Sequence, residues 1–133
     1  MRVEAEVKSS AAGHGVVVRT NESQQSISVP GKPSGQGSSV NGGEFLMLAL
    51  ATCYCNDLYR EAQRLGVTIE STQVVASAEF PGVGLAATSI TYRARVVSPN
   101  AVSEVQRLLR ETDAVAEVHN TLRSGVPVKL LHE

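Results

Sequence analysis

The sequence predicts one α+β domain with the order βββ-α-ββ-αα-β. Three observations predict this class. Residues 2–29 alternate apolar and polar side chains as strands do, residues 42–65 form one long helical stretch, and residues 67–97 return to strand alternation before further helical sequence. A chain of 133 residues is long enough for one ordinary domain and too short for two. We therefore expect residues 1–133 to form a single domain.

Composition excludes several classes of protein. Hydrophobic residues make up 42% and charged residues 19%, which suits a globular protein and not a disordered one. Twelve basic residues balance 13 acidic ones, so nothing indicates a nucleic-acid or membrane partner. The chain opens on charged sequence at Met1–Glu4 instead of a secretory leader. Its longest apolar run, Phe45–Cys55, is shorter than the roughly 18 residues that span a bilayer. We expect a cytoplasmic protein, in keeping with the absence of a disulfide framework.

Three strands are expected before the first helix. Val3, Ala5 and Val7 alternate with charged residues, as in a half-buried strand. Residues 16–19 and 26–29 have similar strand character, with turns expected at residues 13–15, which include His14, and at residues 21–23.

A glycine-rich segment separates these strands from the helix. Residues 30–43 hold five of the 11 glycines and two of the five prolines. A loop of this length is either a functional segment or a disordered connector, and the sequence does not distinguish the two.

The central helix has a clear start and end. Asn41 and Glu44 have the spacing of a capping box, and Gly66 is expected to end the helix after Leu65. Residues 45–55 are apolar on every face, so this half must be covered on every face. A second subunit is expected to cover part of it, which predicts a homodimer. The alternative is a central helix wrapped by the protein's own sheet and helices.

Two long strands follow, about residues 67–80 and 85–97, joined by a glycine-rich turn. In the first of them the apolar phase slips between Ile69 and Val74, which suggests a bulge or a bend.

Two helices and a strand complete the expected order. Ser98 is expected as the N-cap of the first helix and Pro99 as its first residue. The buried stripe of that helix comprises Ala101, Val102, Val105, Leu108 and Leu109. Asp113 is expected to cap a short helix that Gly125 ends, and residues 126–131 form the last strand.

The reactive side chains gather in Cys53-Tyr54-Cys55-Asn56-Asp57 within the long helix. Residues two apart on a helix point about 200° apart, so a Cys53–Cys55 disulfide would require the helix to unwind. Two cysteines alone also fall short of a zinc site, and we predict no metal and no other cofactor. Cys53 is either a nucleophile or a small buried apolar residue; for Cys55 the structural role is favoured.

A nucleophilic Cys53 must become a thiolate, which needs a nearby cation. The candidate cations elsewhere in the chain are His14, Arg19, Arg93, Arg95 and His119. Asp57, one turn after Cys53, would raise the thiol pKa when ionised. The residues on the same helix face as Cys53 are Leu46, Ala49, Leu50, Asn56 and Asp57. Such a face suits an apolar substrate that carries one polar reactive group.

The run from Asn41 to Leu46, followed by Leu50-Ala51-Thr52-Cys53, resembles the OsmC/Ohr family, and residues 120–128 also fit. This resemblance covers nearly the whole chain. It implies an OsmC-like fold, an intertwined homodimer with two sites at the subunit interface, and a thiol peroxidase that reduces organic hydroperoxides.

Three positions depart from the family pattern. The second, resolving cysteine would fall near Ala116, the family's glutamate aligns with Gly43 next to Glu44, and the activating arginine would fall near His14. Turnover would then need an external thiol reductant. The resemblance and the helix face together give the catalytic candidates Cys53, His14 and Glu44 and the substrate-binding candidates Leu46, Leu50 and Asp57. The alternative is a dimer of the same fold that binds a small apolar ligand without catalysis.

Overall fold

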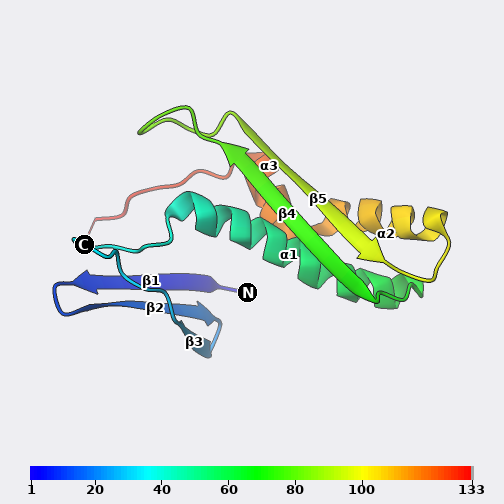
Figure 1. Cartoon of the computed structure of the whole chain (residues 1–133), viewed down its shortest axis with the longest axis horizontal. Coiled ribbons are helices and arrows are strands. Elements are labelled where there is room, and N and C mark those ends of the chain that lie inside the picture. Colours follow the sequence, from blue (N-terminus) through cyan, green and yellow to red (C-terminus); the bar gives the residue numbers. More distant parts are fainter. Residues whose placement is uncertain (133) are drawn as a thin grey trace. The chain divides into compact units, whose positions relative to one another are not determined.

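The computed structural model describes residues 1–132. Its helices and strands follow the predicted order as far as the third helix (Figure 1). They are β1 (Val3–Ser10), β2 (Gly13–Thr20), β3 (Ser23–Ile27), α1 (Gly42–Leu65), β4 (Ser71–Glu79), β5 (Ser89–Val97), α2 (Val102–Val115) and α3 (Glu117–Ser124). The α+β class is therefore confirmed. The chain comprises two compact units, residues 1–45 and the chain from Leu46 onward.

The first unit is an antiparallel sheet in the order β1-β2-β3. The turn between β1 and β2 lies at Ala11-Ala12, two residues earlier than expected, and His14 is a strand residue opposite Ser9. The reason is local, because the hydroxyl of Ser10 accepts the Ala12 N–H at 3.1 Å and stabilises a tight turn without glycine. The strand pairing can then extend as far as Gly13.

The glycine-rich segment is an ordered loop. Lys32 N–H donates to the Gly37 carbonyl at 3.0 Å, and Ser39 N–H donates to the Pro30 carbonyl at 3.0 Å. Gly37 also donates its N–H to the hydroxyl of Ser9 on β1 at 3.0 Å. Its φ of 99° is a conformation that side chains disfavour, which explains a glycine here. Hydrogen bonds therefore join parts of the glycine-rich segment to one another and to β1.

The capping box of α1 is confirmed. Asn41 Oδ1 accepts the Glu44 N–H at 2.8 Å, while Glu44 Oε1 accepts the Asn41 N–H at 3.0 Å. The helix ends as expected at Leu65, and Gly66 follows with a φ of 69°.

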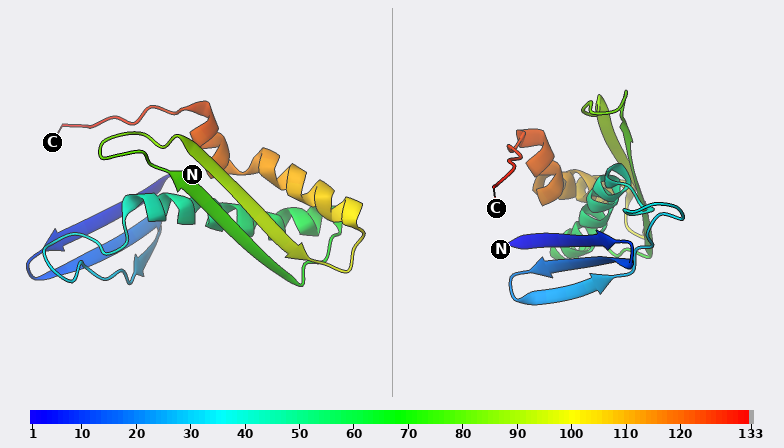
Figure 2. Two further views of the ribbon diagram at one scale, coloured as in Figure 1. Left: turned by 45° about the horizontal axis from the view of Figure 1, so that its top comes forward. Right: turned by 90° about the vertical axis from the view of Figure 1, so that its left-hand side faces the viewer.

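The core of the second unit forms where α1 packs against the β4–β5 hairpin and α2 (Figure 2). Tyr54, Leu58 and Ala62 on α1 meet Leu108 of α2 and Ala116 in this cluster, and all five are buried. Tyr92, Ala94 and Val96 of β5 pack against it with their predicted alternation. The Tyr54 hydroxyl donates to the Leu109 carbonyl at 2.8 Å, so the polar end of this buried ring is satisfied.

The irregularity expected between Ile69 and Val74 is a bend and not a bulge. The pairing of β4 with β5 runs without interruption from Ser71↔Val97 to Glu79↔Ser89, so there is no bulge in this hairpin. The apolar phase slips because the chain bends at Glu70 and β4 begins only at Ser71, after the irregular residues that contain Ile69.

The start of α2 also differs. The helix begins at Val102, and Ser98 instead accepts the Asn100 N–H at 3.1 Å. Asn100 Oδ1 accepts the Thr68 N–H at 2.9 Å, which holds residues 98–100 as a turn. Val102 is consequently 73% exposed, and the buried stripe starts later, at Val105.

The last expected helix and strand need correction as well. Asp113 lies in the last turns of α2 and not at the start of α3, whose N-cap is Ala116. Gly125 ends α3 as expected, with a φ of 66°. Residues 126–131 form no strand, because neither sheet of the described chain includes them as a hydrogen-bonded neighbour.

Candidate functional site

Cys53 lies near the middle of α1 with a half-buried, free thiol. Its Sγ is 3.7 Å from Oδ2 of Asp57, one helical turn later, and the thiol donates to this carboxylate. Asp57 is itself buried and pairs with Arg60 at 2.9 Å. The nearest charged group to the sulfur along its own helix is therefore an acid and not a base.

The pKa of Cys53 is raised above its ordinary value. Burial is the largest cause, and the charge and hydrogen bonding of Asp57 act in the same direction. Backbone hydrogen bonding from Val118 and Glu117, at the start of α3, lowers the pKa in opposition. The net result favours the protonated thiol at neutral pH.

None of the candidate cations is among the groups that shift the Cys53 pKa. His119 is buried on α3, and Arg93 and Arg95 lie on β5. His14 and Arg19 belong to the first unit, where Arg19 donates to Gln24 at 2.9 Å. Within the second unit, the structure brings Cys53 together with Asp57 and the α3 backbone.

The other two catalytic candidates are Glu44, which caps α1, and His14, which lines a cavity in the first unit. The Glu44 carboxylate is used in the capping box of α1. His14 lines a cavity of about 280 Å³ in the first unit, between the β1–β2 turn and the glycine-rich loop. Both of its ring nitrogens are buried without a hydrogen-bond partner among residues 1–132.

Of the three substrate-binding candidates, one lines a cavity and two do not. Leu50 is 2% exposed and lines a cavity of about 280 Å³ in the second unit. Leu46 is half-buried, and neither it nor Asp57 lines that cavity. Cys53 does not line it either, although it lies one turn after Leu50 on the same helix.

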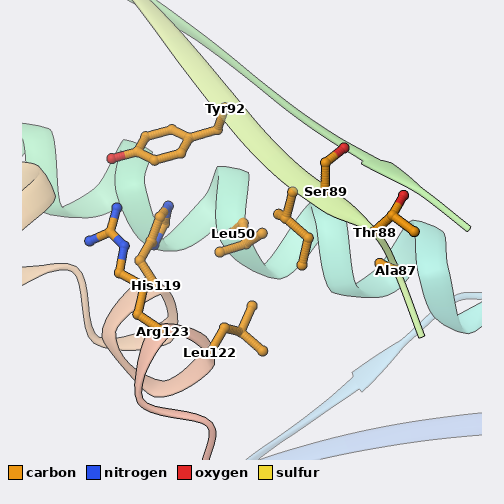
Figure 3. A pocket seen from close by; sticks show the side chains of 9 residues that line it. Leu50, Ala87, Thr88, Ser89, Tyr92, His119, Leu122 and Arg123 are labelled. Atoms are coloured by element: carbon orange, nitrogen blue, oxygen red, sulfur yellow. The ribbon is translucent and has the colours of Figure 1, made fainter.

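This cavity lies between α1, the start of β5 and α3 (Figure 3). His119 and Arg123 stand at one end and Thr88 and Ser89 at the other, with Leu50 and other apolar side chains between them. The remaining lining residues are Ala87, Ile90, Tyr92 and Leu122.

His119 is 3% exposed, and neither ring nitrogen has a partner in the described part of the chain. Leaving a buried polar group unpaired costs about 1–3 kcal/mol, so this imidazole is an open hydrogen-bonding position. Its ring lies edge-on to Tyr92, with centroids 4.4 Å apart. Burial lowers the pKa of His119, and the charge of Arg123 lowers it further against the opposing charges of Asp113 and Asp57. The ring is consequently neutral at pH 7.

A polar cluster beside the cavity was missed in the sequence. Asp113 accepts hydrogen bonds from the Tyr92 hydroxyl and from Arg123, the latter at 2.6 Å. Burial acts to raise the pKa of Asp113, but the bonds from Arg123 and Tyr92 outweigh it and hold the pKa below its ordinary value. These residues come from two helices and a strand, so no local spacing marks them. The only available signal was the opposite charge of Asp113 and Arg123.

Residues 1–132 contain no group of three or more His, Cys, Asp or Glu side chains placed to hold a metal ion. Among the helices described, none combines the length and apolar character needed to cross a membrane.

The fold is shared with solved structures. An OsmC-like protein from Mycoplasma pneumoniae matches with a TM-score of 0.64 and 16% identity, over 98% of this chain and 96% of that one. An organic hydroperoxide resistance protein from Legionella pneumophila gives 0.62 and 15%, over 98% and 95%. One from Elizabethkingia anophelis gives 0.62 and 16%, over 98% and 94%. At these identities the likeness concerns the fold.

Comparison with curated protein sequences found no match. The family model described as OsmC-like protein matches residues 35–131, well over half of the chain. That match includes Cys53 with its helix, the β4–β5 hairpin, and both later helices. The resemblance seen in the sequence is therefore confirmed, and the chain belongs to the OsmC-like protein family.

Proposed function

We propose that this protein reduces organic hydroperoxides through Cys53 and is regenerated by an external thiol. The observation that carries the proposal is the placement of a half-buried, free thiol on α1, with the amides of Val118 and Glu117 acting to stabilise its thiolate. Two solved structures of the same fold are named organic hydroperoxide resistance proteins, which supports the choice of substrate class.

In the proposed reaction the Cys53 thiolate attacks the terminal oxygen of the hydroperoxide ROOH. The S–O bond forms as the O–O bond breaks, and the leaving alkoxide takes up a proton to give ROH. The sulfur is oxidised by two electrons to sulfenic acid. An external thiol condenses with this acid and releases water, and a second thiol then reduces the mixed disulfide to free Cys53.

The need for an external thiol follows from the position where the family has its resolving cysteine. Ala116 is 0% exposed and forms part of the core cluster. A methyl group there offers no second thiol to the sulfenic acid. Cys55 lies on the same helix two residues away, where the helical geometry directs its side chain about 200° from that of Cys53.

The test is a peroxidase assay with cumene hydroperoxide and dithiothreitol, comparing the protein with Cys53→Ser and Cys55→Ser. Activity is expected to be lost in Cys53→Ser and kept in Cys55→Ser, which removes the other half-buried thiol of the same helix. Equal peroxide loss in the protein and Cys53→Ser would contradict the proposal.

A second candidate function is non-enzymatic binding of a small apolar ligand. It is favoured by the raised pKa of Cys53 and by a cavity in the second unit that Cys53 does not line. Native mass spectrometry after gentle purification tests it, since a co-purifying small molecule is expected. A protein that carries none and consumes peroxide excludes non-enzymatic binding as the function of the protein.

We also propose that the protein is a homodimer in a reducing compartment such as the cytoplasm. Leu48, in the apolar half of α1, is 56% exposed. After α3, Val126, Val128 and Leu130 are 56%, 100% and 91% exposed and alternate as in a strand. Alternating apolar residues without a neighbouring strand are a template for pairing with another chain. A second copy would cover both surfaces, and light scattering coupled to size exclusion measures the mass.

A further inference from the structure

The cavity between α1, β5 and α3 is lined by nine residues that do not include Cys53. Its walls comprise apolar side chains, among them Leu50 and Leu122, and its polar groups lie at its two ends (Figure 3). The volume is about 280 Å³. An engineered apolar cavity of about 150 Å³ holds benzene, so this one has room for a molecule about twice that size.

The surroundings of His119 indicate that the cavity holds a ligand. It is 3% exposed and lines the cavity, and neither ring nitrogen has a hydrogen-bond partner among the described residues. A neutral imidazole offers one N–H donor and one nitrogen acceptor. A hydroxyl or amide group in the cavity would satisfy either one.

The charges around the cavity select against an ionic ligand. Arg123 contributes the one charged side chain of the lining, and it already pairs with Asp113 at 2.6 Å. Asp113 is in turn held by the Tyr92 hydroxyl. The hydroxyls of Thr88 and Ser89 at the other end carry no charge. An anion or a cation placed here would lose its hydration without an unpaired opposite charge to replace it.

We propose that this cavity binds a small uncharged organic molecule that has an apolar body and a hydroxyl or amide head group, with His119 hydrogen-bonding the head group. The apolar body lies against Leu50, Ile90 and Leu122. The site is independent of the thiol chemistry of Cys53, which does not line it.

The experiment titrates the full chain at pH 7.5 with three probes that share one body: 3-phenylpropan-1-ol, 3-phenylpropanoate and 3-phenylpropylamine. Calorimetry gives the dissociation constants, and the ring proton signals of His119 in NMR spectra locate the binding. The alcohol is expected to bind at least about tenfold more tightly than either charged probe, and its addition shifts the His119 signals.

Two variants separate this site from a general apolar surface. Leu122→Trp fills the cavity from its rim, where Leu122 is 38% exposed, and is expected to abolish binding. Val102→Trp makes the same kind of change at an exposed apolar position of α2 outside the cavity and is expected to leave binding unchanged. Circular dichroism shows whether each variant is folded. His119→Phe is a further variant that keeps an aromatic ring but removes both ring nitrogens, and it is expected to weaken binding of the alcohol at least about tenfold.

The proposal is overturned if no probe binds saturably, if the carboxylate binds most tightly, or if binding survives Leu122→Trp. It is also overturned if Leu122→Trp dissociates an oligomer, because the cavity would then belong to a subunit interface. These outcomes do not depend on peroxidase activity, so the site and the reaction at Cys53 are tested separately.

Discussion

The thiol of Cys53 donates to the carboxylate of Asp57 across 3.7 Å, one turn apart on the same helix. The anion that a peroxidase must form therefore arises beside an existing negative charge. Burial and this neighbour raise the pKa of Cys53. Thiol reactivity is consequently expected to increase with pH across the alkaline range.

Asp57→Asn is expected to lower the pKa of Cys53 and to accelerate its alkylation by iodoacetamide at pH 7.5 by about threefold to tenfold. The control is Glu61→Gln, which removes another buried carboxylate from α1, one turn further from the sulfur. Rates measured by mass spectrometry at Cys53 should rise only in Asp57→Asn. Equal rates in the two variants would mean that burial alone sets the pKa.

Tyr54→Phe is expected to destabilise the fold by about 1 kcal/mol, because the half-buried Leu109 carbonyl loses the hydrogen bond that the Tyr54 hydroxyl donates. Burial raises the pKa of Tyr54 to about 12, so the hydroxyl remains a donor at any ordinary pH. Tyr59 is 50% exposed on the same helix, and Tyr59→Phe should change stability by less than about 0.5 kcal/mol. Urea denaturation measures both, and similar midpoints would show that the Tyr54 hydrogen bond contributes little.

Stability is expected to fall as the pH decreases from 7.5 to 5. The pKa of His119 is lowered from 6.5 in the folded protein, chiefly by burial, so the unfolded chain binds more protons in this range. The contribution of His119 is complete above pH 6.5 and decreases as the pH falls toward the folded pKa. The pKa of Asp113 is lowered from 3.8, so its contribution changes only at lower pH.

Urea midpoints at pH 7.5 and pH 5 measure this dependence. His119→Phe keeps a ring beside Tyr54 and Tyr92 and should flatten the decline. His132→Gln, a change at an exposed position, should leave the decline as it is. A decline of the same size in His119→Phe would assign it to another group.

Truncation of the chain after Gly125 is expected to convert the proposed homodimer to monomers, because it removes the exposed alternating residues Val126, Val128 and Leu130. Light scattering at micromolar concentration gives the mass. The matched change is Val128→Thr, which keeps β propensity and side-chain shape while making one position polar, and it should weaken the dimer without abolishing it. A truncated chain of unchanged dimer mass would place the interface elsewhere.

Local signals predicted much of this fold. The spacing of Asn41 and Glu44 gave the start of α1, and Gly66 and Gly125 gave two helix ends, because caps depend on neighbouring residues alone. Ser98 failed as a cap because a partner distant in sequence, Thr68, bonds to Asn100 and fixes the turn. The prediction of a strand over residues 126–131 was wrong because a strand also requires a hydrogen-bonded neighbour. The alternation of side chains in a sequence does not show whether such a neighbour exists.

The candidate site was predictable to a smaller degree. The helical spacing of Cys53 and Asp57 correctly placed the acid beside the thiol. The Glu44 carboxylate accepts a hydrogen bond in the capping box of α1, which the spacing of Asn41 and Glu44 also predicted. The cluster of Tyr92, Asp113 and Arg123 joins three elements, so it emerges only from their packing.

The distribution of aromatic rings has a practical result for spectroscopy. The chain has no tryptophan, and its three tyrosines, Tyr54, Tyr59 and Tyr92, all belong to the second unit. Tyr54 and Tyr92 stack edge to face with centroids 4.7 Å apart, a chiral arrangement that gives near-ultraviolet dichroism. Heating that changes the far-ultraviolet spectrum before this tyrosine band would reveal the N-terminal sheet melting as a separate step.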